Sequence, residues 1–276
     1  MGPLVLTRDF DTLEEAYTSV RQKDIFNYNP FNKKGKLSLL KVLWRLILHK
    51  KTVGESKNLR KLIPKFFQES NYDEIRALGC EFTATLACLT QNETAFKSTA
   101  DNSYTDMIDW IWGSANQPVF MSLMEKNGRY WGDGGLKDYL PISYVIGKGA
   151  RHIDVVVHNT PTFTDTDWAP KGTFINTLFR AINILSVDVA EDNIENAKLQ
   201  VELGEEHNME IDLNFYFMSQ SLVDKTENSL IFDKEIMREI LNTGYQSVLD
   251  GTVIKKVYKV DSNGAIHAGK QQAQEG

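Results

Sequence analysis

The chain has 276 residues, of which 42% are hydrophobic and 25% charged, and its formal net charge is −6. This length and composition suit one large globular domain with a sizeable core. No run of 18 or more apolar residues occurs, which excludes a transmembrane helix, and Met1–Asp9 lacks the basic start and the apolar length of a signal peptide. We therefore expect a cytoplasmic protein.

The charge is distributed unevenly along the chain. Ten Lys and Arg residues and a single acid, Glu55, lie between Lys33 and Lys61, so this segment carries +9 and the rest of the chain −15. A basic segment in an acidic protein indicates a surface that meets an anionic partner. No nucleic-acid-binding motif accompanies it, so we expect contact with an anionic lipid interface, peripheral to a membrane, and no binding of nucleic acid.

Three helices are predicted in the N-terminal part. The first starts at Thr12, the expected N-cap, with Glu15 three residues later. The second is predicted at Leu37–His49, where apolar residues dominate. Ser56 is expected to cap the third helix, which Pro64 either ends or kinks.

The basic residues of the second helix define a candidate lipid-binding surface. Lys41 and Arg45 are four residues apart and so share one helical face. Together with Lys50 and Lys51 they are the predicted contacts to lipid headgroups, as on a basic amphipathic helix at a membrane. The alternative is a solvated helix face packed over the core.

The middle of the chain is predicted to contain two hairpins around a helix. Cys80–Leu89 is typical of a strand, and a turn at Gln91–Thr94 leads to its partner. Cys80 and Cys88 would lie roughly 26 Å apart on that strand, too far to form a disulfide. Tyr104–Ala115 is predicted to be helical, with Met107, Ile108, Ile111 and Trp112 on one side. A second hairpin is expected to join the segments Val119–Leu123 and Arg129–Trp131.

Helices and strands alternate in the C-terminal part, which predicts an α/β sheet with mostly parallel strands. The expected elements are a buried parallel strand at Ile153–Val157, a helix from Thr173 to about His207, a strand at Met209–Met218, a helix at Phe232–Leu249 stopped by Gly251, and a short strand at Val253–Val260 in an otherwise loose tail. No repeat or low-complexity linker occurs, so a single domain is expected.

Asp133 is the strongest candidate for a catalytic residue. It lies in the turn Gly132-Asp133-Gly134-Gly135, where a carboxylate can serve as a general base. The alternative is an ordinary hairpin turn, in which Asp-Gly is common. The Gly-x-Ser-x-Gly turn that presents a nucleophilic serine in many acyl hydrolases occurs nowhere in the 276 residues.

An ordered series of motifs resembles the C-terminal half of a patatin-like phospholipase. The series is Ser114-Ala115-Asn116-Gln117-Pro118, then Tyr130–Gly135, Pro141, Gly149-Ala150 and the strand Ile153–Val157. The resemblance implies an α/β three-layer sandwich with a mostly parallel sheet over residues 1–251, followed by an extension over 252–276. It also implies an acyl-lipid or phospholipid substrate and no cofactor.

The resemblance assigns roles to individual residues. Family members use a Ser–Asp dyad, in which Asp133 would be the base and Gly134 and Gly135 would complete its motif. The serine turn, the glycine-rich oxyanion loop and the first strands of the family are absent here, so the chain is expected to start just after the nucleophile. It would then be a lipid acyl hydrolase that is inactive alone. A non-catalytic lipid-binding module and an unrelated α/β protein carrying Asp-Gly-Gly are the alternatives.

Other catalytic residues are possible on residue type alone. Ser114 could act as a nucleophile, although the resemblance makes it structural, and His152 or His158 could join a Ser-His-Asp triad, although structural roles at the ends of a strand are favoured. No His, Cys or Asp cluster has the spacing of a metal site, and no phosphate-binding glycine loop is present.

Overall fold

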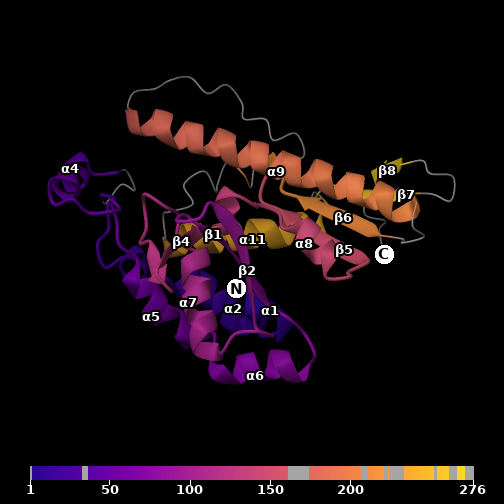
Figure 1. Ribbon diagram of the computed structural model, residues 1–276, viewed down its shortest axis with the longest axis horizontal. Coiled ribbons are helices and arrows are strands. Elements are labelled where there is room, and N and C mark those ends of the chain that lie inside the picture. The colour runs from indigo at the N-terminus through magenta and orange to yellow at the C-terminus, as the bar shows by residue number, and fades with distance from the viewer. Residues whose placement is uncertain are drawn as a thin grey trace. The chain divides into compact units, whose positions relative to one another are not determined.

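A computed structural model describes residues 2–32, 37–160, 174–206, 211–220, 223, 233–251, 254–260 and 266–270. The chain forms two compact units, whose helices and strands are labelled in Figure 1. The first contains Met1–Lys137 and Asn228–Arg238, and the second contains Asp138–Glu227 and Glu239–Gly276. No helix of the described residues is long and apolar enough to cross a membrane.

The first unit begins with helices α1 (Gly2–Leu6), α2 (Phe10–Ser19), α3 (Gln22–Ile25), α4 (Leu39–Ile47), α5 (Lys57–Phe66) and α6 (Glu69–Ala77). The predicted N-cap of α2 is wrong. Asp9 holds that position, because its carboxylate accepts a hydrogen bond from the backbone N–H of Thr12 at 3.1 Å. Thr12 is therefore the third residue of the helix.

Helix α5 starts after Ser56, as predicted, but Ser56 does not cap it with its side chain. The hydroxyl instead donates to Oδ1 of Asn116 at 2.5 Å. The helix continues through Pro64 to Phe66, so the interpretation that Pro64 ends it is wrong.

The sheet of the first unit has the strand order β2-β1-β4-β3, with every pair antiparallel. Its strands are β1 (Thr83–Cys88), β2 (Glu93–Ser98), β3 (Met124–Lys126) and β4 (Arg129–Asp133). The predicted hairpin of β1 and β2 is confirmed. Cys80, however, lies outside β1, and both cysteines are free.

The second hairpin uses a different segment from the one expected. Strand β4 pairs with β3 across a two-residue turn, Asn127-Gly128, in which both residues have positive φ, 55° and 70°. This geometry suits the twist of a two-residue hairpin. Val119 has a φ of 75°, which a β-branched residue in a strand does not adopt, so Val119–Leu123 is not the partner.

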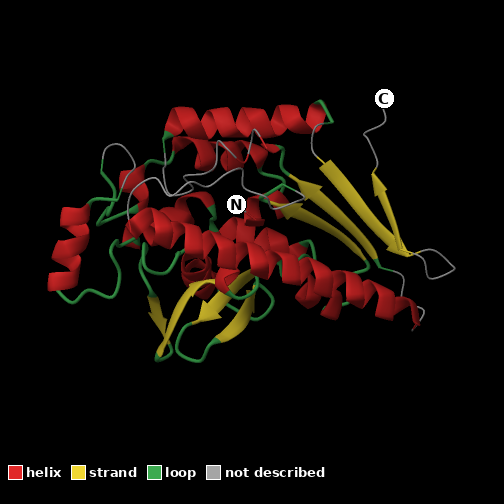
Figure 2. Cartoon of the chain, turned by 90° about the horizontal axis from the view of Figure 1, so that it is seen from above, coloured by secondary structure: helices red, strands yellow, loops and turns green. Residues whose placement is uncertain are grey.

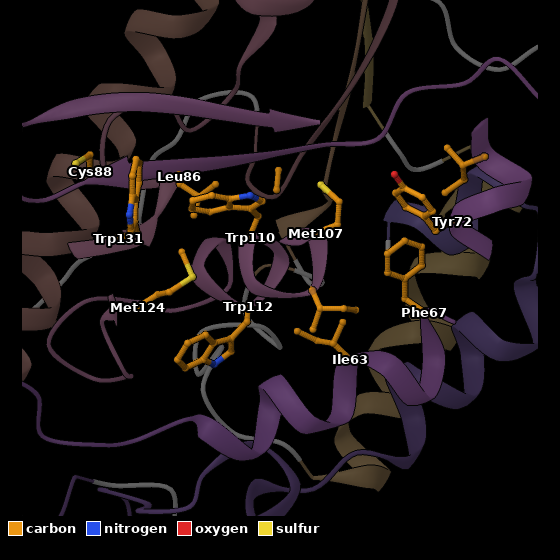
Figure 3. Packing of buried hydrophobic residues seen from close by; sticks show 13 residues of the cluster. Ile63, Phe67, Tyr72, Leu86, Cys88, Met107, Trp110, Trp112, Met124 and Trp131 are labelled. Carbon is orange, nitrogen blue, oxygen red and sulfur yellow. The ribbon is translucent and has the colours of Figure 1, made fainter. Parts of the chain in front are cut away.

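The core of the first unit lies between its sheet and helix α7 (Tyr104–Ser114), which is confirmed together with the burial of Met107, Ile108 and Trp112. Figure 3 shows Trp110 from α7 and Trp131 from β4 within this cluster. Their rings meet edge to face, with centroids 5.4 Å apart. Such contacts add to the hydrophobic gain from burying two large rings. Helix α7 and β4 are therefore fixed against each other.

The second unit has a four-stranded sheet of order β5-β6-β7-β8, whose strands lie side by side at the right of Figure 2. Its elements are α8 (Ile142–Gly147), β5 (His152–Val157), α9 (Phe174–Glu206), β6 (Asp212–Phe217), β7 (Ile254–Val260) and β8 (Ile266–Lys270). Helix α11 (Lys234–Leu249) begins in the first unit and ends in the second. The core of this unit includes Leu213 and Phe215 of β6. Helix α9 contributes apolar residues at helical spacing, namely Ala190, Ile194, Ala197 and Val201. The predicted helices and strands are confirmed within the described residues, and the predicted end residues Thr173, His207, Met209, Phe232 and Val253 lie outside them.

Three predictions for the sheets need correction. Among the described strand pairs only β5 and β6 are parallel, so a mostly parallel sheet is wrong. Short turns join β1 to β2 and β3 to β4, and such connections can only reverse the chain. Strand β5 is buried on one face only, and Val156 on its other face is 72% exposed. Strands β7 and β8 extend the same sheet, so Ile266–Lys270 is not loose.

Candidate active site

Asp133 is the last residue of β4 and is positioned by two neighbouring segments. It lies opposite Leu86 of β1, whose side chain is fully buried. Its backbone N–H donates to the carbonyl oxygen of Asn116, just after α7, at 2.9 Å. Because both neighbours belong to or border the core of the first unit, the backbone of Asp133 is held from both sides.

The carboxylate of Asp133 caps the short turn that follows. Oδ1 accepts a hydrogen bond from the backbone N–H of Gly135 at 2.9 Å and so begins the 3-10 turn η1 (Gly134–Leu136). Burial raises the pKa of Asp133 and outweighs the bond from Gly135, which lowers it. A carboxylate with a raised pKa is a stronger base than an exposed aspartate.

Gly134 is required by a close approach of two backbones. A Cβ atom at this position would lie 2.5 Å from the carbonyl carbon and oxygen of Thr85 in β1. Neither Gly134 nor Gly135 has a positive φ, so tight contact rather than unusual backbone conformation explains the glycine at position 134. A Cβ on Gly132 would similarly meet the ring of Pro118 at 2.8 Å.

A buried polar network supports the segment that binds Asp133. The backbone N–H of Ser56 donates to Oγ of Ser122 at 2.9 Å, and the backbone N–H of Ser122 returns a bond to Oγ of Ser56 at 3.2 Å. The indole of Trp112 donates to the carbonyl of Ser56 at 3.0 Å. Ser56, Asn116 and Ser122 are all buried. The local sequence pattern does not indicate this network, although Asn116 lies within the motif Ser114–Pro118.

The other candidate residues have surroundings of their own. Ser114 is partly buried at the end of α7. His152 and His158 are exposed at the two ends of β5, and Nδ1 of His152 lies 3.6 Å from a carboxylate oxygen of Asp212. In the part of the chain that the structure describes, no group of His, Cys, Asp or Glu could hold a metal ion.

The basic face of α4 points inward, which corrects its expected role. Arg45 is buried, donates from Nε to the carbonyl of Thr52 at 2.9 Å, and pairs through Nη1 with Glu55 at 2.7 Å. Nζ of Lys41 donates to the carbonyls of Asn29 and Phe31, both at 2.9 Å. The helical face that Lys41 and Arg45 share therefore bonds to neighbouring segments of the same unit.

The two lysines that follow α4 have different surroundings. Lys50 and Lys51 are exposed. Nζ of Lys51 lies 3.9 Å from the centre of the Tyr130 ring and donates to the Tyr130 hydroxyl. Both lysines remain accessible to an anionic partner.

The structure defines a mixed α/β protein with a partly buried aspartate in a turn beside the first sheet. A model of the patatin-like phospholipase family matches residues 3–146, a range that includes the whole Asp133 turn. The chain therefore belongs to the patatin-like phospholipase family, whose members are lipid acyl hydrolases. No curated protein matches the chain.

Proposed function

We propose that this chain contributes the general base of a lipid acyl hydrolase acting on acyl esters of phospholipids, and that Asp133 is that base. The carboxylate at the end of β4 supports the proposal most strongly. It is fixed by Gly135, its pKa is raised by burial, and it lies within the matched family region.

In this proposal a serine hydroxyl attacks the ester carbonyl while Asp133 accepts its proton. The proton then passes to the departing alcohol, and an acyl-serine remains. Water then attacks the acyl-serine while the same carboxylate takes up its proton, and that proton passes to the serine oxygen as the fatty acid leaves. Because Oδ1 of Asp133 is held by Gly135, Oδ2 is the oxygen that receives the proton.

The nucleophile and the oxyanion donors complete the proposal. The sequence contains no Gly-x-Ser-x-Gly turn, and Ser56 and Ser122 are buried within a network of their own. We therefore place the reactive serine in residues outside this sequence and expect the 276 residues to be inactive alone. Each missing oxyanion donor accounts for about 3–4 kcal/mol of transition-state stabilisation.

A non-catalytic lipid-binding module is the second candidate function. The exposed Lys50 and Lys51 and the apolar outer surface of α4 favour a protein that meets an anionic membrane from the cytoplasmic side. This function needs no nucleophile. It would leave Asp133 as a residue that stabilises the turn.

Labelling with a fluorophosphonate, which reacts with activated serines, tests the proposal. The 276-residue chain should remain unlabelled. The same chain expressed with the in-frame codons that precede Met1, which we call the extended protein, should be labelled at a serine of the added segment. Labelling of the 276-residue chain that Ser114→Ala abolishes would overturn the placement of the nucleophile. Absence of labelling in both proteins would favour the non-catalytic module.

A further inference from the structure

Helix α4 presents its apolar residues to solvent and its basic residues to the protein. The exposed apolar residues are Leu39, Leu40, Leu43, Trp44, Leu46, Ile47 and Leu48, with exposures from 46 to 81%. Arg45 is the only buried residue of the helix. We call these seven exposed residues the apolar α4 surface.

The orientation of α4 is fixed by polar contacts. The guanidinium of Arg45 reaches Thr52 and Glu55 in the loop after the helix and lies 4.9 Å from the centre of the Tyr28 ring. Lys41 binds the carbonyls of Asn29 and Phe31 in the segment before it. Turning the apolar side inward would move Arg45 to solvent, break these bonds and remove the charged partner of Glu55, which is costly.

The size of the apolar α4 surface argues against a second protein copy as its partner. The helix has nine residues and is about 14 Å long. A stable protein interface uses roughly 20–30 residues on each side. Seven residues on one short helix fall well below that requirement, so dimerisation through this surface alone would be weak.

Charge and composition favour a lipid surface instead. Lys50 and Lys51 follow the helix and are exposed, so positive charge borders the apolar α4 surface. Trp44 is 57% exposed, and an aromatic ring beside long aliphatic chains is typical of helices that lie at the boundary between headgroups and acyl chains. Anionic headgroups would meet the lysines while the leucines enter the apolar layer.

We infer that α4 is a membrane-docking helix, which inserts Leu40, Leu43 and Trp44 into the acyl-chain boundary of an anionic bilayer while Lys50 and Lys51 contact lipid phosphates. This inference builds on the proposed lipid substrate, because it identifies how the protein reaches a lipid surface. It replaces the expected contacts of Lys41 and Arg45 with apolar ones.

Vesicle flotation of the full chain tests the inference. Phosphatidylcholine vesicles that contain phosphatidylserine should bind the protein more tightly than pure phosphatidylcholine vesicles, and salt should weaken this difference. Leu40→Glu should reduce binding about tenfold or more, because it removes an inserted leucine and brings a carboxylate to the bilayer. Leu185→Glu, at a 64% exposed leucine of α9, is the matched control and should bind like the wild type.

Brominated lipids, which quench nearby tryptophans, locate the contact. Trp110, Trp112 and Trp131 are buried, so the quenching lost in Trp44→Phe reports on α4. Equal binding by Leu40→Glu and the wild type, or quenching that Trp44→Phe leaves unchanged, would overturn the inference. So would a dimer that Leu40→Glu dissociates, since that result identifies a second copy as the partner.

These experiments distinguish a failure of the docking inference from a failure of the proposed function. Asp133→Asn should bind vesicles like the wild type, because Asp133 takes no part in docking. If vesicle binding is absent while the extended protein hydrolyses soluble esters, the inference about α4 is wrong and the proposed function stands. If binding is present and hydrolysis absent, the proposed function is wrong and the docking helix stands.

Discussion

The Asp133 turn and helix α4 belong to the same unit but are stabilised in opposite ways. The turn is fixed by close packing, since Gly134 allows its backbone to touch β1 and its neighbours are buried. Helix α4 is held by the polar groups of Lys41 and Arg45, and its apolar side faces solvent. The first region is a tightly packed turn, as the proposed general base requires, and the second is the proposed membrane-docking surface.

Substituting Gly134 should have the largest effect on stability. Gly134→Ala places a Cβ 2.5 Å from the backbone of Thr85, and because neither backbone segment can move freely we expect a loss of about 3 kcal/mol. Gly147→Ala at the end of α8, where a Cβ meets nothing within 4 Å, should change stability by less than about 1 kcal/mol. Urea unfolding followed by circular dichroism measures both. Similar midpoints for the two variants would contradict the close approach.

Removing Arg45 should have the next largest effect. Arg45→Met breaks the bond to Thr52 and removes the charged partner of Glu55, for an expected loss of about 2 kcal/mol. Lys50→Met, at an exposed neighbour, should change stability by less than about 0.5 kcal/mol. An Arg45→Met variant as stable as Lys50→Met would show that polar contacts do not hold α4.

The ion pair of Arg45 and Glu55 also makes the stability of the fold depend on pH. Burial opposes ionisation of Glu55, but hydrogen bonds from Arg45 and Asn27 prevail and hold the pKa of Glu55 below its usual range. The stabilisation is therefore present above the ordinary pKa of glutamate and is lost as pH falls through the lowered value. In Arg45→Met this loss on acidification should be smaller, which thermal unfolding at several pH values would detect.

Asp133→Asn should have the smallest effect on stability, and of opposite sign. Burial raises the pKa of Asp133, so ionisation disfavours the folded state, and stability is lost as pH rises from the ordinary aspartate pKa through the raised one. An asparagine stays neutral and can still accept from Gly135. The variant should match the wild type in acid and be more stable near neutral pH. Lower stability at neutral pH would contradict a desolvated carboxylate.

Much of the fold could be predicted from local sequence patterns. The apolar spacing in α7 and α9 and the alternation in β6 specify these elements because each buries one side against a core. Strand pairing could not be predicted in the same way. Strand β1 pairs with β4, more than 40 residues later, and only the folded chain brings them together.

The candidate site could be predicted in part. The ordered motifs around Asp133 identified the turn and the family. A close approach of two backbones admits only glycine at Gly134, so this part of the motif can be recognised in the sequence. The support from Ser56 and Ser122 could not be predicted, since these residues are 66 apart in the chain. The inward face of α4 was missed because its partners, Thr52 and Glu55, are recognised only in three dimensions.

Ester hydrolysis by the extended protein, with Asp133→Asn compared with Asp138→Asn, tests the central claim most directly. Both carboxyls have pKa values raised by burial, and they lie five residues apart in the sequence. If Asp133 is the general base, Asp133→Asn should reduce kcat/KM for a p-nitrophenyl ester by about 10²–10⁴-fold, and Asp138→Asn should leave it nearly unchanged. Full activity of Asp133→Asn would contradict the account.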